Sequence, residues 1–208
     1  MARRRPPAPY PALMSGQLPL FTLEDDVPLV VDVEGLLLAG GALVRRDAAA
    51  RISVVVDVGW RAEVVCDGLD RRGLGGELGT PDNGRCSVRS GFDVRLLDLA
   101  RRWTVGASFR VPTDFVLTPG RLRFWAVATG QRDQVGYLLR LGSTDEQLWD
   151  AAGSALSAAG VPGAFLGSRA GGPAYRIVGR RRLARLREML GRPPIDDAAG
   201  DWPGRPDA

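Results

Sequence analysis

The chain has 208 residues, 45% of them hydrophobic, which suits one globular domain or two small fused repeats with a shared core. All 28 basic residues are arginine, and the net charge of +4 favours a polyanionic partner, with a solvated arginine surface as the alternative. No apolar run reaches the ~18–20 residues of a membrane span, and no apolar stretch follows the basic N-terminus. We therefore expect a cytoplasmic, nucleoid-associated protein.

The chain contains no histidine and only two cysteines, Cys66 and Cys86. This composition excludes Ser-His-Asp and Cys-His catalysis and the usual zinc sites. No cofactor is expected unless the protein is a nuclease, in which case carboxylates would have to hold a hard ion such as magnesium.

Residues 1–26 are rich in Pro, Ala and Arg and predict a disordered arm. The arm contains a short motif, made of Gln17, Leu18, Pro19, Leu20 and Phe21. This Gln-Leu-x-Leu-Phe pattern resembles the peptide that bacterial replication and repair proteins insert into the sliding clamp. The three apolar side chains have no local core, the proline keeps the segment extended, and the glutamine can hydrogen-bond at a pocket rim. The alternative is an edge strand packed on the protein's own domain.

The first folded unit is predicted over residues 27–103. It opens with a buried, leucine-rich helix over Val30–Leu43, whose small residues Ala39–Ala42 would let a second helix approach closely. A turn at Asp47–Ala50 and a β-branched strand over Arg51–Val58 follow. The remaining predicted elements are helix Trp60–Arg72, a hairpin turning at Pro81–Gly84, and helix Phe92–Trp103.

A linker over residues 104–118 leads to the second unit, predicted over residues 119–191. This unit opens with a helix over Pro119–Thr129 and a turn at Gln131–Gln134. Its other predicted elements are strand Gly136–Leu141, a helix capped by Ser143 or Thr144 and running to Ala159, strands Ala164–Ser168 and Ala174–Val178, and helix Arg181–Leu190. Residues 192–208 predict a disordered tail.

The same element order, helix–hairpin–helix–hairpin–helix, occurs twice, with an offset near 86 residues. The predicted fold class is α+β, with two pseudo-symmetric repeats in a monomer. The segment Leu38-Ala39-Gly40-Gly41-Ala42-Leu43, with Trp125–Gly130 as a weaker match, resembles the motif helix of the LAGLIDADG homing endonucleases. It is also similar to the degenerate motif of WhiA-type bacterial transcription regulators, which keep the fold without the nuclease.

The resemblance implies that each motif helix ends in an acidic residue that helps to hold the catalytic metal ions. With Leu38 as the start of the motif, that position falls at Arg45, and its equivalent in the second unit is Gln131. Neither can do the work of that acidic residue, and an arginine there would repel a divalent cation. Asp47 and Asp133, two residues further on, are either displaced metal ligands or simple turn residues.

The resemblance also implies a DNA-binding saddle made by the strands of both units. Nine arginines fall on the predicted hairpins and are the candidate DNA contacts: Arg45, Arg46, Arg51, Arg85, Arg89, Arg132, Arg140, Arg169 and Arg176. A separate dense run, Arg180–Arg187, predicts either an accessory backbone contact or a solvated helical face.

These features favour a nuclease-inactive LAGLIDADG-like DNA-binding protein that Gln17–Phe21 recruits to the replication sliding clamp, in DNA replication or repair. A divergent magnesium-dependent DNA endonuclease using Asp47 and Asp133 is one alternative. A WhiA-like transcription regulator and a protein–protein adaptor without a DNA role are the others.

Overall fold

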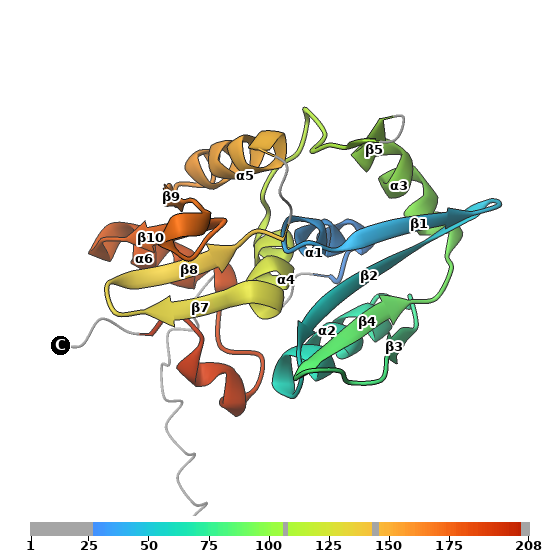
Figure 1. Ribbon diagram of the computed structural model, residues 1–208, viewed down its shortest axis with the longest axis horizontal. Coiled ribbons are helices and arrows are strands. Elements are labelled where there is room, and N and C mark those ends of the chain that lie inside the picture. Colours follow the sequence, from blue (N-terminus) through green and yellow to red (C-terminus); the bar gives the residue numbers. More distant parts are fainter. Residues whose placement is uncertain (1–26, 106–107, 143–145, 205–208) are drawn as a thin grey trace, which may run out of the picture.

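The computed structural model describes residues 27–105, 108–142 and 146–204, and it confirms an α+β fold with two repeated units (Figure 1). The first unit comprises the 3₁₀ turn η2 (Val30–Val33), α1 (Glu34–Leu38), β1 (Ala42–Arg46), β2 (Ala49–Asp57), α2 (Trp60–Asp70), β3 (Gly76–Leu78), β4 (Arg85–Ser90), η3 (Val94–Leu96) and α3 (Leu97–Trp103). The second comprises α4 (Pro119–Thr129), β7 (Gly130–Asp133), β8 (Gly136–Arg140), α5 (Glu146–Ala158), β9 (Ala164–Leu166), η4 (Ser168–Ala170), β10 (Ala174–Val178) and α6 (Arg180–Leu190). The proposed helix caps Ser143 and Thr144 lie outside the described residues.

Each unit contains a four-stranded antiparallel sheet, and the two sheets have matching strand orders, β1-β2-β4-β3 and β7-β8-β10-β9. The hairpin registers correct the offset between the units. The two-residue turn of the first hairpin begins at Asp47, whereas that of the second begins at Gln134, and these positions are 87 residues apart. Asp47 is therefore a turn residue, while Asp133 is the last residue of a strand, so the two aspartates are not equivalent.

The first helix is shorter than predicted. The segment Val30–Leu43 forms η2 and α1, which ends at Leu38, and β1 begins at Ala42. Gly40 ends the helix with a φ of +93°, a backbone conformation that side chains avoid. A Cβ at Gly40 would lie 2.7 Å from Gly142 Cα, so this glycine admits a loop of the second unit rather than another helix.

The contact between α1 and α4 instead depends on Gly35. A Cβ there would lie 1.9 Å from the carbonyl oxygen of Arg121 and 3.0 Å from Phe124 Cβ. Around this contact, Leu36, Leu37 and Leu38 of α1 and Leu122 and Trp125 of α4 are fully buried. The two helices lie side by side between the sheets at the centre of the molecule (Figure 1).

A buried ion pair holds the start of α1 in place. Glu34 is fully buried, and its Oε2 lies 2.6 Å from Nη2 of Arg121, which is nearly buried. The indole of Trp103 in α3 donates a hydrogen bond of 3.0 Å to the other carboxylate oxygen. These three side chains connect α1, α3 and α4, and both carboxylate oxygens have a partner, as a buried charge requires.

The linker and the tail are more ordered than the sequence predicts. The linker contains a short hairpin, β5 (Thr104–Val105) and β6 (Ser108–Phe109). The C-terminal segment, expected to be disordered, is folded as far as Gly204 and contains η5 (Asp196–Gly200). Trp202 is 2% exposed and its indole donates to the carbonyl of Gly191 at 3.0 Å. Burial of this aromatic ring, an ion pair between Arg61 and Asp201, and a hydrogen bond from Arg187 to the carbonyl of Gly204 dock this Pro- and Asp-rich segment.

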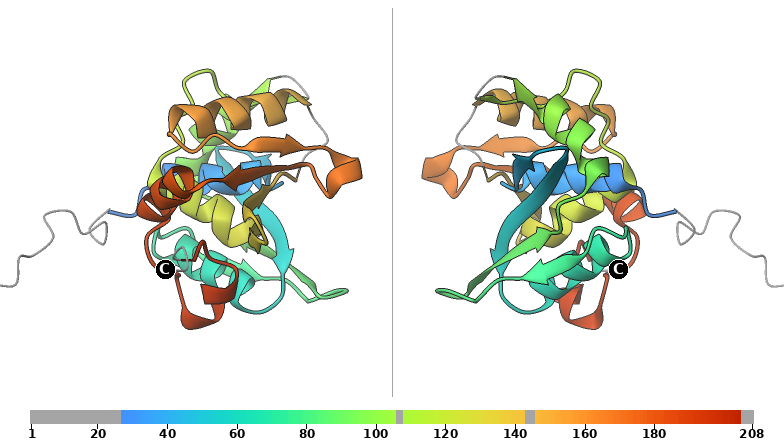
Figure 2. Two further views of the ribbon diagram at one scale, coloured as in Figure 1. Left: turned by 90° about the vertical axis from the view of Figure 1, so that its left-hand side faces the viewer. Right: turned by 90° about the vertical axis from the view of Figure 1, so that its right-hand side faces the viewer.

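Figure 1 looks onto the strands, and the side views in Figure 2 show α2 and α6 on the opposite side of the molecule. The start of the described chain also leaves on that helical side (Figure 2). None of the described helices is long and apolar enough to cross a membrane.

Candidate nucleic-acid interface

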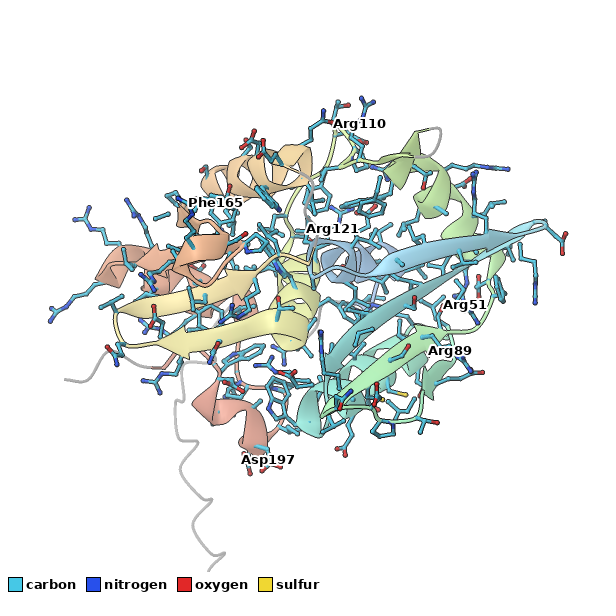
Figure 3. All side chains as sticks on the ribbon, viewed as in Figure 1. Arg51, Arg89, Arg110, Arg121, Phe165 and Asp197 are labelled. Atoms are coloured by element: carbon cyan, nitrogen blue, oxygen red, sulfur yellow. The ribbon has the colours of Figure 1, made fainter. Side chains whose placement is uncertain are left out.

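The outer face of the first sheet carries four arginines. Alternate residues of β2, among them Ala50 and Ile52, are buried, so Arg51 between them and its alternates point away from the core. Residues paired across an antiparallel sheet lie on the same face. The registers therefore give the outer arginines as Arg46, Arg51, Arg85 and Arg89. Figure 3 shows Arg51 and Arg89 on neighbouring strands.

Two acidic residues share this face, so the charge is unevenly distributed. Arg89 Nε lies 2.8 Å from Glu77 Oε2, which partly neutralises the far edge of the sheet. Asp57 pairs with Arg85 in the strand register. The least compensated charge therefore belongs to Arg46 and Arg51, near the first hairpin.

Phe92 organises these two arginines. The guanidinium carbons of Arg46 and Arg51 lie 4.0 Å and 4.8 Å from the centroid of its ring. Cation–π contacts of this kind hold long side chains in one geometry and limit the entropy lost on binding. The result is a positive pair held in place at the outer end of the first sheet.

The outer face of the second sheet is less basic. Arg140 and Arg176 lie on it, because their neighbours along the strands, Leu139, Tyr175 and Ile177, face the core on the other side of the sheet. Arg176 Nε lies 2.7 Å from Asp133 Oδ2, which neutralises it, and Arg140 donates to the carbonyl of Gly171 at 2.6 Å. Arg140 is thus the main positive group of this sheet.

Three of the nine candidate arginines lie elsewhere. Arg45 pairs with Ala50, which is fully buried, so Arg45 lies on the helical face of the first sheet. Arg132 pairs with the fully buried Tyr137 and lies on the helical face of the second sheet. Arg169 lies in η4, an exposed connection between β9 and β10. Strand alternation explains the first two corrections, because Arg45 is one position out of phase with Arg46 and Arg132 is one position out of phase with Gln131 and Asp133.

A cavity of about 320 Å³ joins the two outer faces. It lies at the C-terminal end of α4, where Arg85 of the first sheet and Arg140 of the second both line it. Asp57, Thr129 and Asp201 line it as well. The two sheets therefore form one surface, with this cavity at its centre.

Arg61 occupies the floor of the cavity and caps α4. It is 7% exposed, donates to the carbonyls of Val127 and Gly130 at 2.7 and 2.6 Å, and pairs with Asp201 at 3.1 Å. The carbonyl end of a helix is negative, so a buried guanidinium stabilises it. The same positive charge opposes a divalent cation at this place.

The ends of the two central helices lack the acidic residues that the resemblance implies. The string Leu38-Ala39-Gly40 closes α1, and Arg45 lies in β1 rather than at the end of that helix. α4 ends at Thr129 and Gly130, and Gln131 already belongs to β7. Neither helix end provides a carboxylate.

Asp47 and Asp133 cannot share a metal ion in this arrangement. They lie at the tips of the two hairpins, which point to opposite ends of the molecule (Figure 1). Asp133 is already paired with Arg176. Within the described ranges, no group of three or more His, Cys, Asp or Glu side chains could hold a metal ion.

The predicted clamp-binding motif Gln17–Phe21 lies outside the described residues. Sequence reasoning missed Phe92 and Arg61. Phe92 lies two residues after the basic strand β4, and that spacing could have suggested an aromatic partner for the arginines. Arg61 gives no such signal, because its role depends on α4, more than sixty residues away in the chain.

The fold matches solved structures despite very low sequence identity. The homing endonuclease I-WcaI, solved bound to its DNA recognition sequence, is 11% identical, with a TM-score of 0.61 over 82% of this chain and 84% of that one. The N-terminal LAGLIDADG domain of DUF199/WhiA is 10% identical, with a TM-score of 0.54 over 80% and 82% of the two chains. No family model and no curated protein matches the sequence. The chain therefore has a LAGLIDADG-like fold.

Proposed function

We propose that the protein is a nuclease-inactive, LAGLIDADG-like DNA-binding protein that holds duplex DNA against the outer faces of its two sheets. The arm would bring it to the replication sliding clamp through Gln17–Phe21, for a role in DNA replication or repair. The observation that carries the DNA-binding part is the continuous outer surface on which Arg46, Arg51, Arg85 and Arg140 lie.

Charge and shape both support this proposal. Arginine contacts to phosphates provide sequence-independent affinity for DNA. The similar I-WcaI binds a DNA recognition sequence, which makes duplex DNA the natural first ligand to test. The last residues of α1 and α4 are not acidic, and Arg61 places a positive charge at the end of α4, where it pairs with Asp201; both features support a protein that binds without cutting.

The DNA surface is tested with two arginines of the first sheet. The double variant Arg46→Ala plus Arg85→Ala should weaken duplex binding and reduce the slope of log affinity against log salt by about 2, because each phosphate contact contributes ~0.9. Fluorescence anisotropy of a labelled duplex over a salt series measures both quantities.

Arg45→Ala is the matched control, since it removes a neighbouring charge from the opposite face of the same strand. It should leave the slope nearly unchanged. An equal loss of DNA affinity in Arg45→Ala and in the single variant Arg46→Ala would mean that the outer face of the sheet has no special role in DNA binding.

Recruitment to the clamp needs a separate measurement. A peptide of residues 14–24 should bind the bacterial sliding clamp, and Leu20→Ala plus Phe21→Ala should abolish binding, because these side chains would fill the apolar pocket. Binding that survives the double substitution would remove the clamp from the proposal. The described chain begins on the helical side, opposite the strands, and this placement favours simultaneous clamp and DNA contact.

A divergent endonuclease is the second candidate, because the similar I-WcaI is itself a homing endonuclease. Incubation of plasmid and branched DNA with magnesium or manganese separates the two candidates. We expect intact DNA in every reaction. Cleavage that is lost in Asp57→Ala, which removes a carboxylate from the central cavity, would establish the enzyme instead.

A further inference from the structure

A second basic site lies away from the outer sheet faces, where the β7–β8 hairpin meets α6 and the C-terminal segment. A cavity of about 220 Å³ is lined there by Arg132, Arg180 and Arg187, together with Gly204. We call it the arginine cavity, after these three arginines. Its volume is several times the ~30 Å³ that one water molecule occupies in the liquid, so a polyatomic ion fits inside.

Two of the guanidinium groups converge on one residue. Arg187 Nη1 donates a hydrogen bond of 2.6 Å to the carbonyl of Gly204. A Cβ added to Gly204 would lie 2.8 Å from Arg132 Cζ, so the guanidinium of Arg132 packs against the same glycine. Arg180, the first residue of α6, brings a third positive charge to the cavity.

Nothing in the described part of the chain balances these charges. The carboxylate that lines the cavity belongs to Asp133, whose Oδ2 lies 2.7 Å from Arg176 and whose Oδ1 accepts from the backbone of Gln134 at 2.7 Å. Among the described residues, no acidic side chain pairs with any of the three cavity arginines. Like charges around one cavity repel each other unless an anion lies between them.

We propose that the arginine cavity binds a phosphate group. Planar guanidinium groups match the oxygen atoms of phosphate and form strong charge-assisted hydrogen bonds with them. The first turn of α6, which has no side-chain cap, adds backbone N–H donors on the same side. The phosphate belongs either to the backbone of DNA that extends past the second sheet or to a free phosphate compound. The DNA source rests on the proposed function, whereas the anion site itself does not.

The test of the anion site is the binding of inorganic phosphate to the full-length chain, which phosphorus NMR measures at low ionic strength. Arg132→Ala plus Arg180→Ala removes two cavity charges and keeps the bond between Arg187 and Gly204. Arg181→Ala plus Arg182→Ala removes the same charge from exposed positions of α6. We expect roughly tenfold weaker binding in the cavity variant only, as the loss of charge-assisted hydrogen bonds predicts. Equal binding by the two variants would overturn the proposal.

The same proteins with a labelled DNA duplex identify the source of the phosphate. If it belongs to DNA, the cavity variant should reduce the salt slope by 1–2 relative to the control variant. An unchanged slope, with phosphate binding lost, would assign the cavity to a free phosphate compound. If the wild-type protein binds phosphate but no DNA, the proposed function fails and the anion site stands.

Discussion

Two charged side chains of this protein, Arg61 and Glu34, are buried and have partners for their charges. Arg61 is buried yet satisfied, because its guanidinium meets two carbonyls at the end of α4 and the carboxylate of Asp201. Glu34 is satisfied in the same way by Arg121 and Trp103. Such buried groups fix the relative positions of helices more than they add net stability.

Tyr137 differs from Arg61 and Glu34, because its buried polar group has no hydrogen-bond partner among the described residues. Its side chain is fully buried in the second sheet, and burial strongly raises its pKa above the ordinary value of about 10. Within the described ranges its hydroxyl has no hydrogen-bond partner. The neutral phenol is therefore favoured in the folded state. Tyr137 contributes to the free energy of unfolding below pH 10, and this contribution is lost as the pH rises further.

The substitution Tyr137→Phe should remove this loss of folding stability at alkaline pH. The free energy of unfolding of the wild-type protein should fall by about 1.4 kcal/mol more than that of the variant between pH 9 and 11. At pH 7 the variant should be equally or slightly more stable, because an unpaired buried hydroxyl costs free energy. Urea unfolding at each pH measures both effects, and parallel pH profiles for the two proteins would contradict the assignment.

At the scale of elements, turn chemistry was easier to predict than helix length. The predicted turn at Pro81–Gly84 is confirmed, because Asn83 and Gly84 both adopt positive φ and form a two-residue hairpin loop. The leucine-rich run of the first unit was misjudged, because a buried helix and the strand after it look equally apolar. The docked tail was missed, because its order depends on a tertiary contact of Trp202.

The close approach of α1 and α4 gives a prediction at this scale. Gly35→Ala would place a methyl group 1.9 Å from the carbonyl oxygen of Arg121, so the helices would have to separate. We expect a loss of about 1–3 kcal/mol, as overpacking usually causes. Gly167→Ala is the control, because it has an ordinary φ of −75° and no heavy atom within 4 Å of the added carbon. Thermal unfolding of both variants measures this loss, and equal unfolding midpoints for Gly35→Ala and Gly167→Ala would contradict the close packing of α1 and α4.

At the scale of the whole molecule, the repeat and the α+β class could be read from the order of elements. The division of the arginines between the two faces of each sheet could not, because it depends on strand register. Arg45 and Arg46 are neighbours in sequence but lie on opposite faces. The candidate DNA surface therefore contains fewer arginines than the nine predicted, and most of them lie on the first sheet.

Photo-crosslinking tests this surface most directly. A photoreactive p-benzoylphenylalanine replaces Val55, which is exposed on the outer face of β2, or Asp67, which is exposed on α2. The account predicts that a labelled duplex crosslinks strongly at position 55 and at background level at position 67. Equal crosslinking at the two positions, or crosslinking at position 67 alone, would contradict the claim that the outer sheet faces bind DNA.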